Sequence, residues 1–182
     1  LTREAAVYAA SGWSSFNEPL LEPHWTTENI EPIGSGSDAS WYSLSEKPGT
    51  LVLSMPQDTE KKLTMSNPSH PILWRDLPDS TNWSLHTDLS LNSLQQGDFI
   101  AGLIVEIKEG TFTRRYVIAI EDGDYLRVKR SSGGNYTQQK SESWNEGSAT
   151  IRIRREGRSL IFERRGEPGE WLELYTRNLP LN

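Results

Sequence analysis

The sequence predicts an all-β protein of the sandwich or barrel type. Short segments alternate apolar and polar residues, turn residues recur about every 8–12 positions, and long helical periodicity is almost absent. The chain has 182 residues, which is long enough to bury a sizeable core without disulfides. We therefore expect residues 1–182 to form a single β-sandwich domain.

The first part of the chain gives the weakest signals. Residues 2–10 fit either a short helix or an edge strand, and residues 16–25 carry two prolines, which favour an extended or looped entry. Residues 29–40 are rich in Gly, Pro, Ser and Asp and predict a surface loop, as do the polar residues 55–64. Short strands or apolar pieces are expected at 41–45, 50–54 and 72–75.

Residues 83–91 show the cleanest alternation in the sequence. Such a pattern is typical of an antiparallel strand with one face on a core and one face in solvent. The expected core face holds Trp83, Leu85, Thr87, Leu89 and Leu91, and the expected outer face holds His86 and Asp88.

The longest apolar run, within residues 97–107, predicts a central strand buried on both faces. Gly102 interrupts this run, and a glycine inside a strand usually marks a bend, a bulge or a close approach by another layer.

The C-terminal half predicts further strands separated by turns. Glu121–Asp124 is a hairpin signal between residues 114–120 and 125–130, and residues 131–135 suggest a flexible connection. Three more strands are expected at 149–155, 159–164 and 171–175. A strip of outward arginines is expected to be a solvated strand face, with contact to an acidic glycan or a protein as the alternative: Arg152, Arg154, Arg164 and Arg165.

Several short motifs follow one another in a familiar order. They are Pro48–Leu53, Trp83, Gly97-Asp98 with Ala101–Leu103, Tyr125–Val128, Ile151–Ile153 with Arg155–Gly157, Phe162 and Trp171. Over about residues 13–176, the chain thereby resembles the concanavalin-A-like domain at the C-terminus of family-43 β-xylosidases and related stand-alone jelly-roll domains.

This resemblance implies a two-sheet antiparallel jelly-roll sandwich of the concanavalin A-like lectin/glucanase type, with a concave face often used for carbohydrate. The chain departs from the family in two ways. Residues 162–167 replace the usual Tyr-Ser-x-Asp-Gly, and there is no catalytic propeller.

Charge and composition exclude some functions. The net charge of −6 has both signs interspersed, which argues against nucleic-acid binding, and no apolar segment is long enough to span a membrane. The chain has no Cys, so thiolate chemistry is excluded. We expect no cofactor. A structural Ca²⁺ is an alternative to simple turn chemistry for Asp38, Asp58, Asp122 and Asp124.

The sequence leans against catalysis. Glycosidases use two facing carboxylates, which on one strand occur at a spacing of two. Glu106 and Glu109 are three apart, as are Glu170 and Glu173, so we expect each pair on opposite strand faces. Residues 135–138 resemble part of a polysaccharide-lyase motif, but its companion motifs are missing.

Carbohydrate binding needs an aromatic ring for the apolar face of a sugar and planar polar groups for its hydroxyls. Trp74, Arg75 and Asp76 have this composition, although Trp74 in a core is the simpler interpretation. Trp83 and Trp171 fit core strand positions, whereas Trp144 lies in a polar loop and is expected to be exposed. Secondary candidates on or near the middle hairpin are Tyr116, Tyr125, Arg127 and Tyr136, together with Trp144.

The first hypothesis is therefore a non-catalytic carbohydrate-binding or accessory module of a larger glycan-active protein. Its partners would be a polysaccharide or oligosaccharide and the other domains of that protein, and its location extracellular or periplasmic. The second hypothesis is a protein-interaction or structural sandwich without glycan affinity. The third is a cryptic glycoside hydrolase or polysaccharide lyase.

Overall fold

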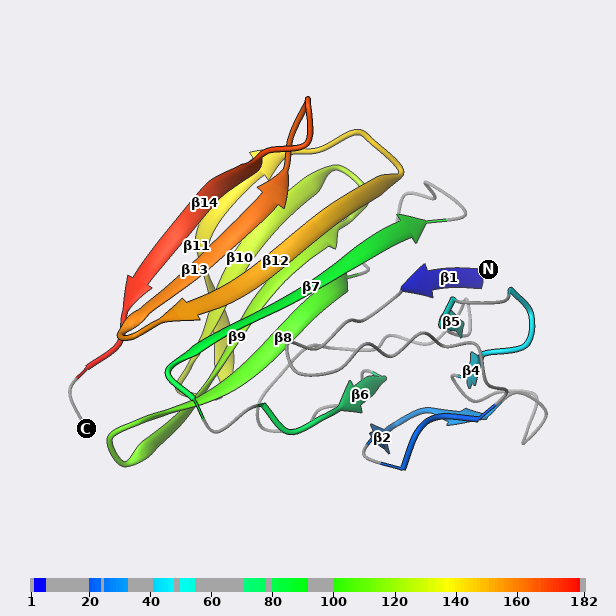
Figure 1. Cartoon of the computed structure of the whole chain (residues 1–182), viewed down its shortest axis with the longest axis horizontal. Coiled ribbons are helices and arrows are strands. Elements are labelled where there is room, and N and C mark those ends of the chain that lie inside the picture. Colours follow the sequence, from blue (N-terminus) through cyan, green and yellow to red (C-terminus); the bar gives the residue numbers. More distant parts are fainter. Residues whose placement is uncertain are drawn as a thin grey trace.

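The computed structural model describes residues 2–5, 20–23, 25–32, 41–47, 50–54, 71–77, 80–91 and 100–180. Every regular element within these ranges is a β-strand (Figure 1). The strands are β1 (Thr2–Ala5), β2 (Thr26–Glu28), β3 (Glu31–Pro32), β4 (Trp41–Ser43), β5 (Val52–Ser54), β6 (Ile72–Trp74), β7 (Asn82–Leu91), β8 (Ile100–Glu109), β9 (Phe112–Glu121), β10 (Tyr125–Ser132), β11 (Asn135–Ser143), β12 (Ser148–Glu156), β13 (Ser159–Arg165) and β14 (Trp171–Asn178).

The strands form two main sheets and one small one. The larger sheet has eight strands in the order β14-β13-β12-β7-β1-β5-β4-β3, and its neighbours are antiparallel except for β3 and β4. The second sheet has four antiparallel strands in the order β11-β10-β9-β8. Strands β2 and β6 pair separately as an antiparallel two-stranded sheet.

The two main sheets pack face to face as a β-sandwich, with β7 and β12–β14 opposite β8–β11 (Figure 1). The core between them draws side chains from both sheets. Three aromatic rings cross it: Phe162 lies 6.0 Å from Tyr116 of the opposite sheet and 5.9 Å from Tyr175, measured between ring centroids. The all-β prediction is confirmed.

The alternation predicted for residues 83–91 is also confirmed. Within β7, Trp83, Leu85, Thr87 and Leu89 are buried, whereas His86 is half-buried and Asp88 is exposed. The neighbouring β12 shows the same pattern, with Ala149, Ile151 and Ile153 in the core and Arg152 and Arg154 on the outer face. Period-two alternation therefore identified both the strands and the faces that they bury.

The prediction of a central strand over residues 97–107 is wrong about its position. Strand β8 lies at the end of the four-stranded sheet, and its burial alternates, with Leu103, Val105 and Ile107 buried and Glu106 exposed. Its neighbour β9 is buried on both faces, because all residues from Tyr116 to Ile120 are buried. An apolar run alone did not distinguish a strand between layers from a strand at a sheet end.

Gly102 does mark a close approach, but by the neighbouring strand rather than by another layer. It pairs with Ala119 of β9. A Cβ atom on Gly102 would lie 2.5 Å from the Ala119 Cα and 2.6 Å from its Cβ, and would also overlap the Ile118 carbonyl oxygen.

Three other predictions need correction or completion. The undecided segment at residues 2–10 contains a strand, β1, and it lies between β5 and β7 rather than at a sheet edge. The predicted flexible connection at 131–135 is a tight turn at Gly133-Gly134, followed by a strand, β11, that the sequence pattern did not indicate. The predicted surface loop at 29–40 contains the short strand β3 at residues 31–32, and its remainder, 33–40, lies outside the described residues, as does the predicted loop at 55–64.

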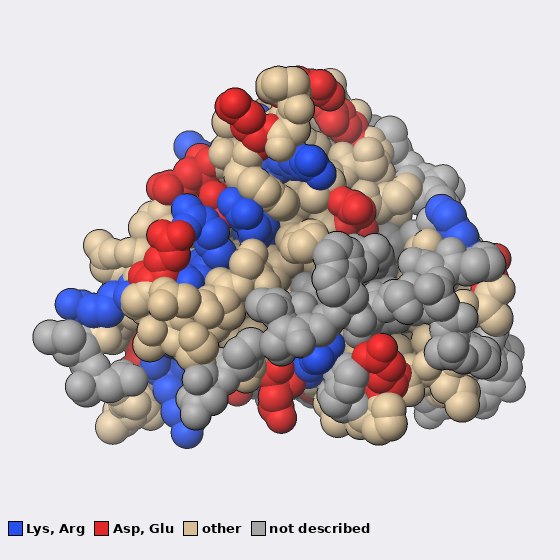
Figure 2. Space-filling model, in the orientation of Figure 1, with Lys and Arg blue, Asp and Glu red and all other residues tan. Residues whose placement is uncertain are grey.

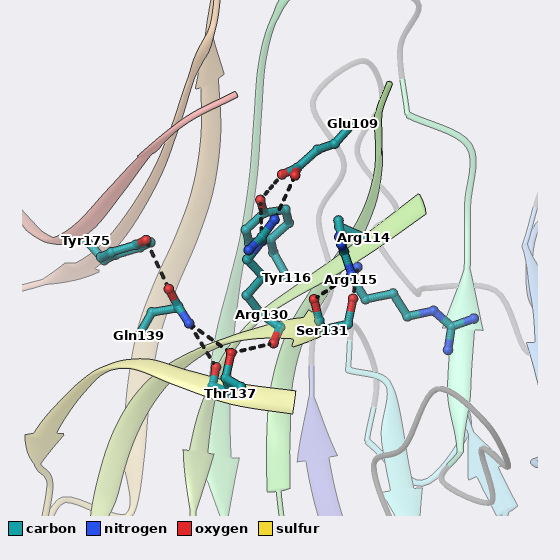
Figure 3. A network of polar contacts seen from close by, with 9 residues as sticks. All are labelled: Glu109, Arg114, Arg115, Tyr116, Arg130, Ser131, Thr137, Gln139 and Tyr175. Atoms are coloured by element: carbon teal, nitrogen blue, oxygen red, sulfur yellow. Dashed lines mark hydrogen bonds and ion pairs between the residues drawn. The ribbon is translucent and has the colours of Figure 1, made fainter. Parts of the chain in front are cut away.

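Side chains also join β11 to the opposite sheet. The Arg164 Nη2 of β13 donates to the Glu142 Oε1 at 2.9 Å, and the Tyr175 hydroxyl of β14 donates to the Gln139 Oε1 at 3.2 Å (Figure 3). These two bonds tie the polar strand β11 to the edge of the eight-stranded sheet.

Candidate functional site

The outer face of the four-stranded sheet collects most of the polar and aromatic candidates. Strand alternation and register place on it the side chains that point away from the sandwich core. This four-stranded outer face includes Glu106, Arg115, Glu121, Tyr125, Arg127, Lys129 and Tyr136.

One end of the face is centred on Tyr125, which is 38% exposed. The Arg127 guanidinium lies over the Tyr125 ring at 4.3 Å from its centroid. The Arg127 Nη1 is also 2.8 Å from Glu121 Oε2 and 3.6 Å from Asp122 Oδ2, and Lys129 bonds the other Glu121 oxygen. The hairpin signal Glu121–Asp124 thus positions an aromatic ring beside planar polar groups.

Glu121 stays charged in this arrangement. Burial alone would raise the pKa of its carboxyl group, but hydrogen bonds from Lys129 and Arg127 and the positive charges of both residues outweigh burial and lower the pKa. The carboxylate is therefore an acceptor that holds two cationic side chains in place.

The other end of the face is organised by Arg115. Its Nε donates to Glu106 Oε2 at 2.9 Å, and its guanidinium lies 5.1 Å from the Trp74 ring centroid. The Trp74 Nε1 in turn donates to Glu28 Oε2 at 2.7 Å. Arg115 also interacts with Tyr136, where burial raises the pKa of the phenol and Arg115 partly offsets this. Tyr136 therefore remains a neutral phenol across the physiological range.

Three of the eight predicted site residues, Tyr125, Arg127 and Tyr136, are thus brought to one face, and a fourth, Trp74 of β6, packs against Arg115 of that face. The Tyr125 end and the Arg115 end are separated by the six residue steps along β9 from Arg115 to Glu121, which corresponds to roughly 20 Å.

The other four predicted residues lie elsewhere. Arg75 lies over the Trp25 ring at 5.8 Å, and Asp76 is exposed. Tyr116 is fully buried, and its ring belongs to the core. Trp144 is 8% exposed and also belongs to the core, so the expectation that it is exposed is wrong.

Trp144 can be buried because its indole N–H has a hydrogen-bond acceptor and its ring packs against another side chain. Its Nε1 donates to the Ser148 carbonyl oxygen at 3.2 Å, and the Arg164 guanidinium lies over the ring at 5.3 Å. The polar residues on either side, Ser143 and Asn145, are exposed, so the polarity of sequence neighbours does not indicate whether the ring is buried.

A buried polar cluster lies inside the sandwich, at the end where β8 turns into β9 (Figure 3). The Tyr116 hydroxyl donates to Glu109 Oε1, and the Arg130 Nη2 donates to Glu109 Oε2 at 2.8 Å. The Arg130 Nε also donates to the Tyr116 hydroxyl at 3.2 Å. The cluster is closed in on itself, which fits a structural role better than a role in ligand binding.

These contacts set the protonation states of the cluster. Burial would raise the pKa of Glu109, but hydrogen bonds from Tyr116 and Arg130 and the charges of Arg130 and Arg177 outweigh it, and the pKa falls below 4.5. Burial and the bond to Glu109 raise the pKa of Tyr116. Glu109 is therefore ionised and Tyr116 neutral at neutral pH.

The outer face of the eight-stranded sheet carries a cluster that the sequence did not predict. Trp171, expected in the core, is half-buried on this outer face. The Arg152 guanidinium lies 3.9 Å from its ring centroid, and Arg152 and Arg154 both donate to Glu163 Oε2, at 2.7 and 2.9 Å. The four arginines expected to form one positive strip therefore have different partners. Arg152 and Arg154 both pair with Glu163, whereas Arg164 donates to Glu142.

The described residues contain no group of three or more His, Cys, Asp or Glu side chains that could hold a metal ion. Of the four aspartates considered for Ca²⁺, Asp122 and Asp124 lie in the β9–β10 turn. Asp38 and Asp58 lie outside the described residues.

Within the described ranges, no helix has the length and apolar character needed to cross a lipid bilayer.

The fold and these two faces define a β-sandwich protein with polar and aromatic clusters on the outside of both sheets. Comparison with protein-family models, with curated proteins and with solved structures finds no match for the chain.

Proposed function

We propose that this chain is a non-catalytic carbohydrate-binding or accessory module of a secreted, glycan-active protein, with a jelly-roll sandwich of the concanavalin A-like type. The ligand would be a neutral oligosaccharide or polysaccharide lying along the four-stranded outer face.

One observation carries this proposal: Tyr125 and Tyr136 lie on the same face, Trp74 of β6 packs against Arg115 of that face, and each of the three rings is beside an arginine. Sugars need an apolar ring for their C–H face and rigid hydrogen-bonding groups for their hydroxyls, as binding sites for small polar ligands generally do. Arg127 and Arg115 are held by Glu121 and Glu106, so their guanidinium groups are already ordered before a ligand binds.

The spacing favours an extended ligand. The roughly 20 Å between the two ends of the face exceeds the reach of one sugar ring. A chain of several sugars that follows β10 and β11, beside the buried Val117 and Ala119 of β9, could contact Tyr125 at one end and Tyr136 at the other, so that two weak contacts act together.

The carboxylates on this face are arranged for binding rather than for bond cleavage. Glu106 and Glu121 lie at opposite ends of it, beyond the roughly 5–10 Å that separates the two acids of a glycosidase. Glu121 and Asp122 are close, but they share Arg127, and the pKa of Glu121 is lowered. A general acid needs a raised pKa, so Glu121 does not suit the role of proton donor.

The test is binding to a panel of neutral polysaccharides, including xylan, cellulose, mannan and β-glucan, by affinity electrophoresis, followed by calorimetry with the corresponding hexasaccharides. We expect Tyr125→Ala and Tyr136→Ala each to weaken binding about tenfold, and the double variant to weaken it further. Phe112→Ala is the matched control, because Phe112 is an aromatic residue that is 63% exposed but lies at the β8–β9 turn.

Wild-type binding to none of these polysaccharides would overturn the proposed function and favour the protein-interaction hypothesis. Equal binding by the wild type and the double tyrosine variant would remove this face as the site. Release of reducing ends from any polysaccharide in the panel would favour the glycosidase or lyase hypothesis instead.

A further inference from the structure

Trp171 lies across the outer face of the eight-stranded sheet rather than standing at its edge. It belongs to β14, at the end of the sheet, yet its ring centroid is 6.3 Å from that of His86 on β7, three strands away. Three strand spacings amount to roughly 14 Å. The indole must therefore extend over β13 and β12 toward β7.

The side chains beneath the indole are held firmly. The Arg152 guanidinium lies 3.9 Å from the ring centroid, and its Nε bonds Glu163 Oε2 at 2.7 Å. Arg154 donates to the same oxygen at 2.9 Å. Glu163 is only 4% exposed although it is on the outer face of a sheet, which fits its ion pairs with both Arg152 and Arg154.

The Trp171 ring is packed on one side but is not enclosed. The Arg152 guanidinium lies over the ring, and the residue as a whole is half-buried rather than buried. An aromatic ring that is held in place by a guanidinium and is still partly exposed can stack against the apolar face of a pyranose.

The charges around the ring fit a neutral, polar ligand. Arg152 and Arg154 are matched by Glu163 and Glu156, with which they form ion pairs. In Figure 2, Lys and Arg side chains likewise lie next to Asp and Glu side chains in the region where Figure 1 places β12 to β14. A balanced surface offers hydrogen-bonding groups to hydroxyls and gives no net attraction for an anion.

We propose that Trp171, with Arg154 and His86 at its rim, is a second carbohydrate-binding platform, which takes a neutral pyranose. It shares the ligand class of the proposed function and rests on it in that respect, but it uses different residues on the opposite sheet. The domain would then bind one glycan chain on each side of the sandwich, and its retention on a polymer surface would exceed that of either site alone.

The experiment is calorimetric titration of the full chain with xylohexaose, cellohexaose and mannohexaose. For whichever of the three binds the wild type, we expect about two ligands per chain. Trp171→Ala should reduce this to about one, as should Tyr125→Ala/Tyr136→Ala, and combining all three substitutions should abolish binding. Leu172→Ala is the matched control, because Leu172 is the next residue and is 41% exposed.

Two measurements separate loss of a site from loss of folding. Urea unfolding should show Trp171→Ala to be folded under the titration conditions, and Trp171→Phe, which keeps a ring for stacking, should retain the second site with weaker affinity. Quenching or shift of tryptophan fluorescence by the ligand should persist in Tyr125→Ala/Tyr136→Ala, because Trp171 is the reporter.

The outcomes distinguish this inference from the proposed function. One ligand per wild-type chain, lost in the double tyrosine variant and kept in Trp171→Ala, would overturn the second platform and leave the first site standing. One ligand lost only in Trp171→Ala would support the platform and overturn the first site. Binding of no hexasaccharide, with no polysaccharide retained, would overturn both.

Discussion

Gly102 shows how a single missing methyl group sets the distance between two strands. It pairs with Ala119, and the space that a Cβ would need is filled by backbone atoms of β9, including the Ala119 Cα at 2.5 Å. Backbone atoms cannot rotate away as the end of a long side chain can. Strand β8 would therefore have to shift away from β9 to accept even alanine at position 102.

We therefore expect Gly102→Ala to destabilise the protein by about 3 kcal/mol, at the upper end of the cost of overpacking, as measured by urea unfolding. Gly110→Ala is the comparison. Gly110 has φ of +62° and no neighbouring atom within 4 Å of a Cβ, so its cost should be only about 1 kcal/mol of backbone strain. A Gly102→Ala variant as stable as Gly110→Ala would contradict the close approach.

The tryptophans show the limit of prediction at the scale of single residues. Trp83 was correctly placed in the core by alternation. The local pattern predicts an exposed Trp144 and a core Trp171, and both predictions are wrong, because the polarity of sequence neighbours does not indicate what surrounds a ring in the fold. The ring of Trp144 is covered by Arg164, which is 20 residues further along the chain, and that of Trp171 rests on Arg152. Neither contact is visible in a local pattern.

At the scale of strands, alternation found the elements whose two faces differ. Strands β7, β9, β10, β12, β13 and β14 were all predicted within a few residues of their ends. Strand β11 was missed because its residues are almost all polar, and it is positioned by backbone pairing with β10 and by its bonds to Arg164 and Tyr175. The face shared by Tyr125, Tyr136 and Arg115 depends on this pairing, so half of the candidate site could not be assembled from the sequence.

The buried cluster of Glu109, Tyr116 and Arg130 should make the free energy of unfolding depend on pH in the acidic range. The pKa of Glu109 is lower in the folded protein than its ordinary value of 4.5. Its ionised form therefore contributes stability above about pH 4.5, and this contribution is lost as the pH falls through the folded pKa.

We expect Glu109→Gln to be less stable than the wild type by about 1–3 kcal/mol at pH 7, and the difference to shrink as the pH falls below about 4. Urea unfolding over a pH series measures this. Glu146→Gln, which changes an exposed carboxylate after β11, should follow the wild type at every pH. A Glu109→Gln deficit that stays constant with pH would contradict the role assigned to the charge.

At the scale of the whole molecule, we expect the strands to differ in how readily their backbone hydrogen bonds open. Residues Ile118 and Ile120 of β9 and residues 151 and 153 of β12 are buried at the centre of the sandwich, whereas β11 is polar and ends its sheet. Amides that exchange only on global unfolding are found in such central strands.

Hydrogen exchange followed by mass spectrometry should therefore show the slowest exchange in peptides from β9 and β12, and clearly faster exchange in β11. The β8 peptides should be intermediate, because β8 buries one face and pairs on one side with β9. Exchange in β11 as slow as in β9 would contradict this ranking and would mean that its ties to β13 and β14 dominate its stability.

The composition of β11 has a consequence for how the protein behaves at high concentration. An outermost strand presents backbone donors and acceptors to which another polypeptide can add, and this is a common start of aggregation. Here that strand carries lysine, glutamate, serine and glutamine, and its register shifts at Gln139. Pairing of a second molecule with β11 would bury those charges, and the register shift would interrupt the backbone hydrogen bonds between the two strands. The polar composition that made β11 hard to recognise in the sequence therefore also opposes edge-to-edge aggregation.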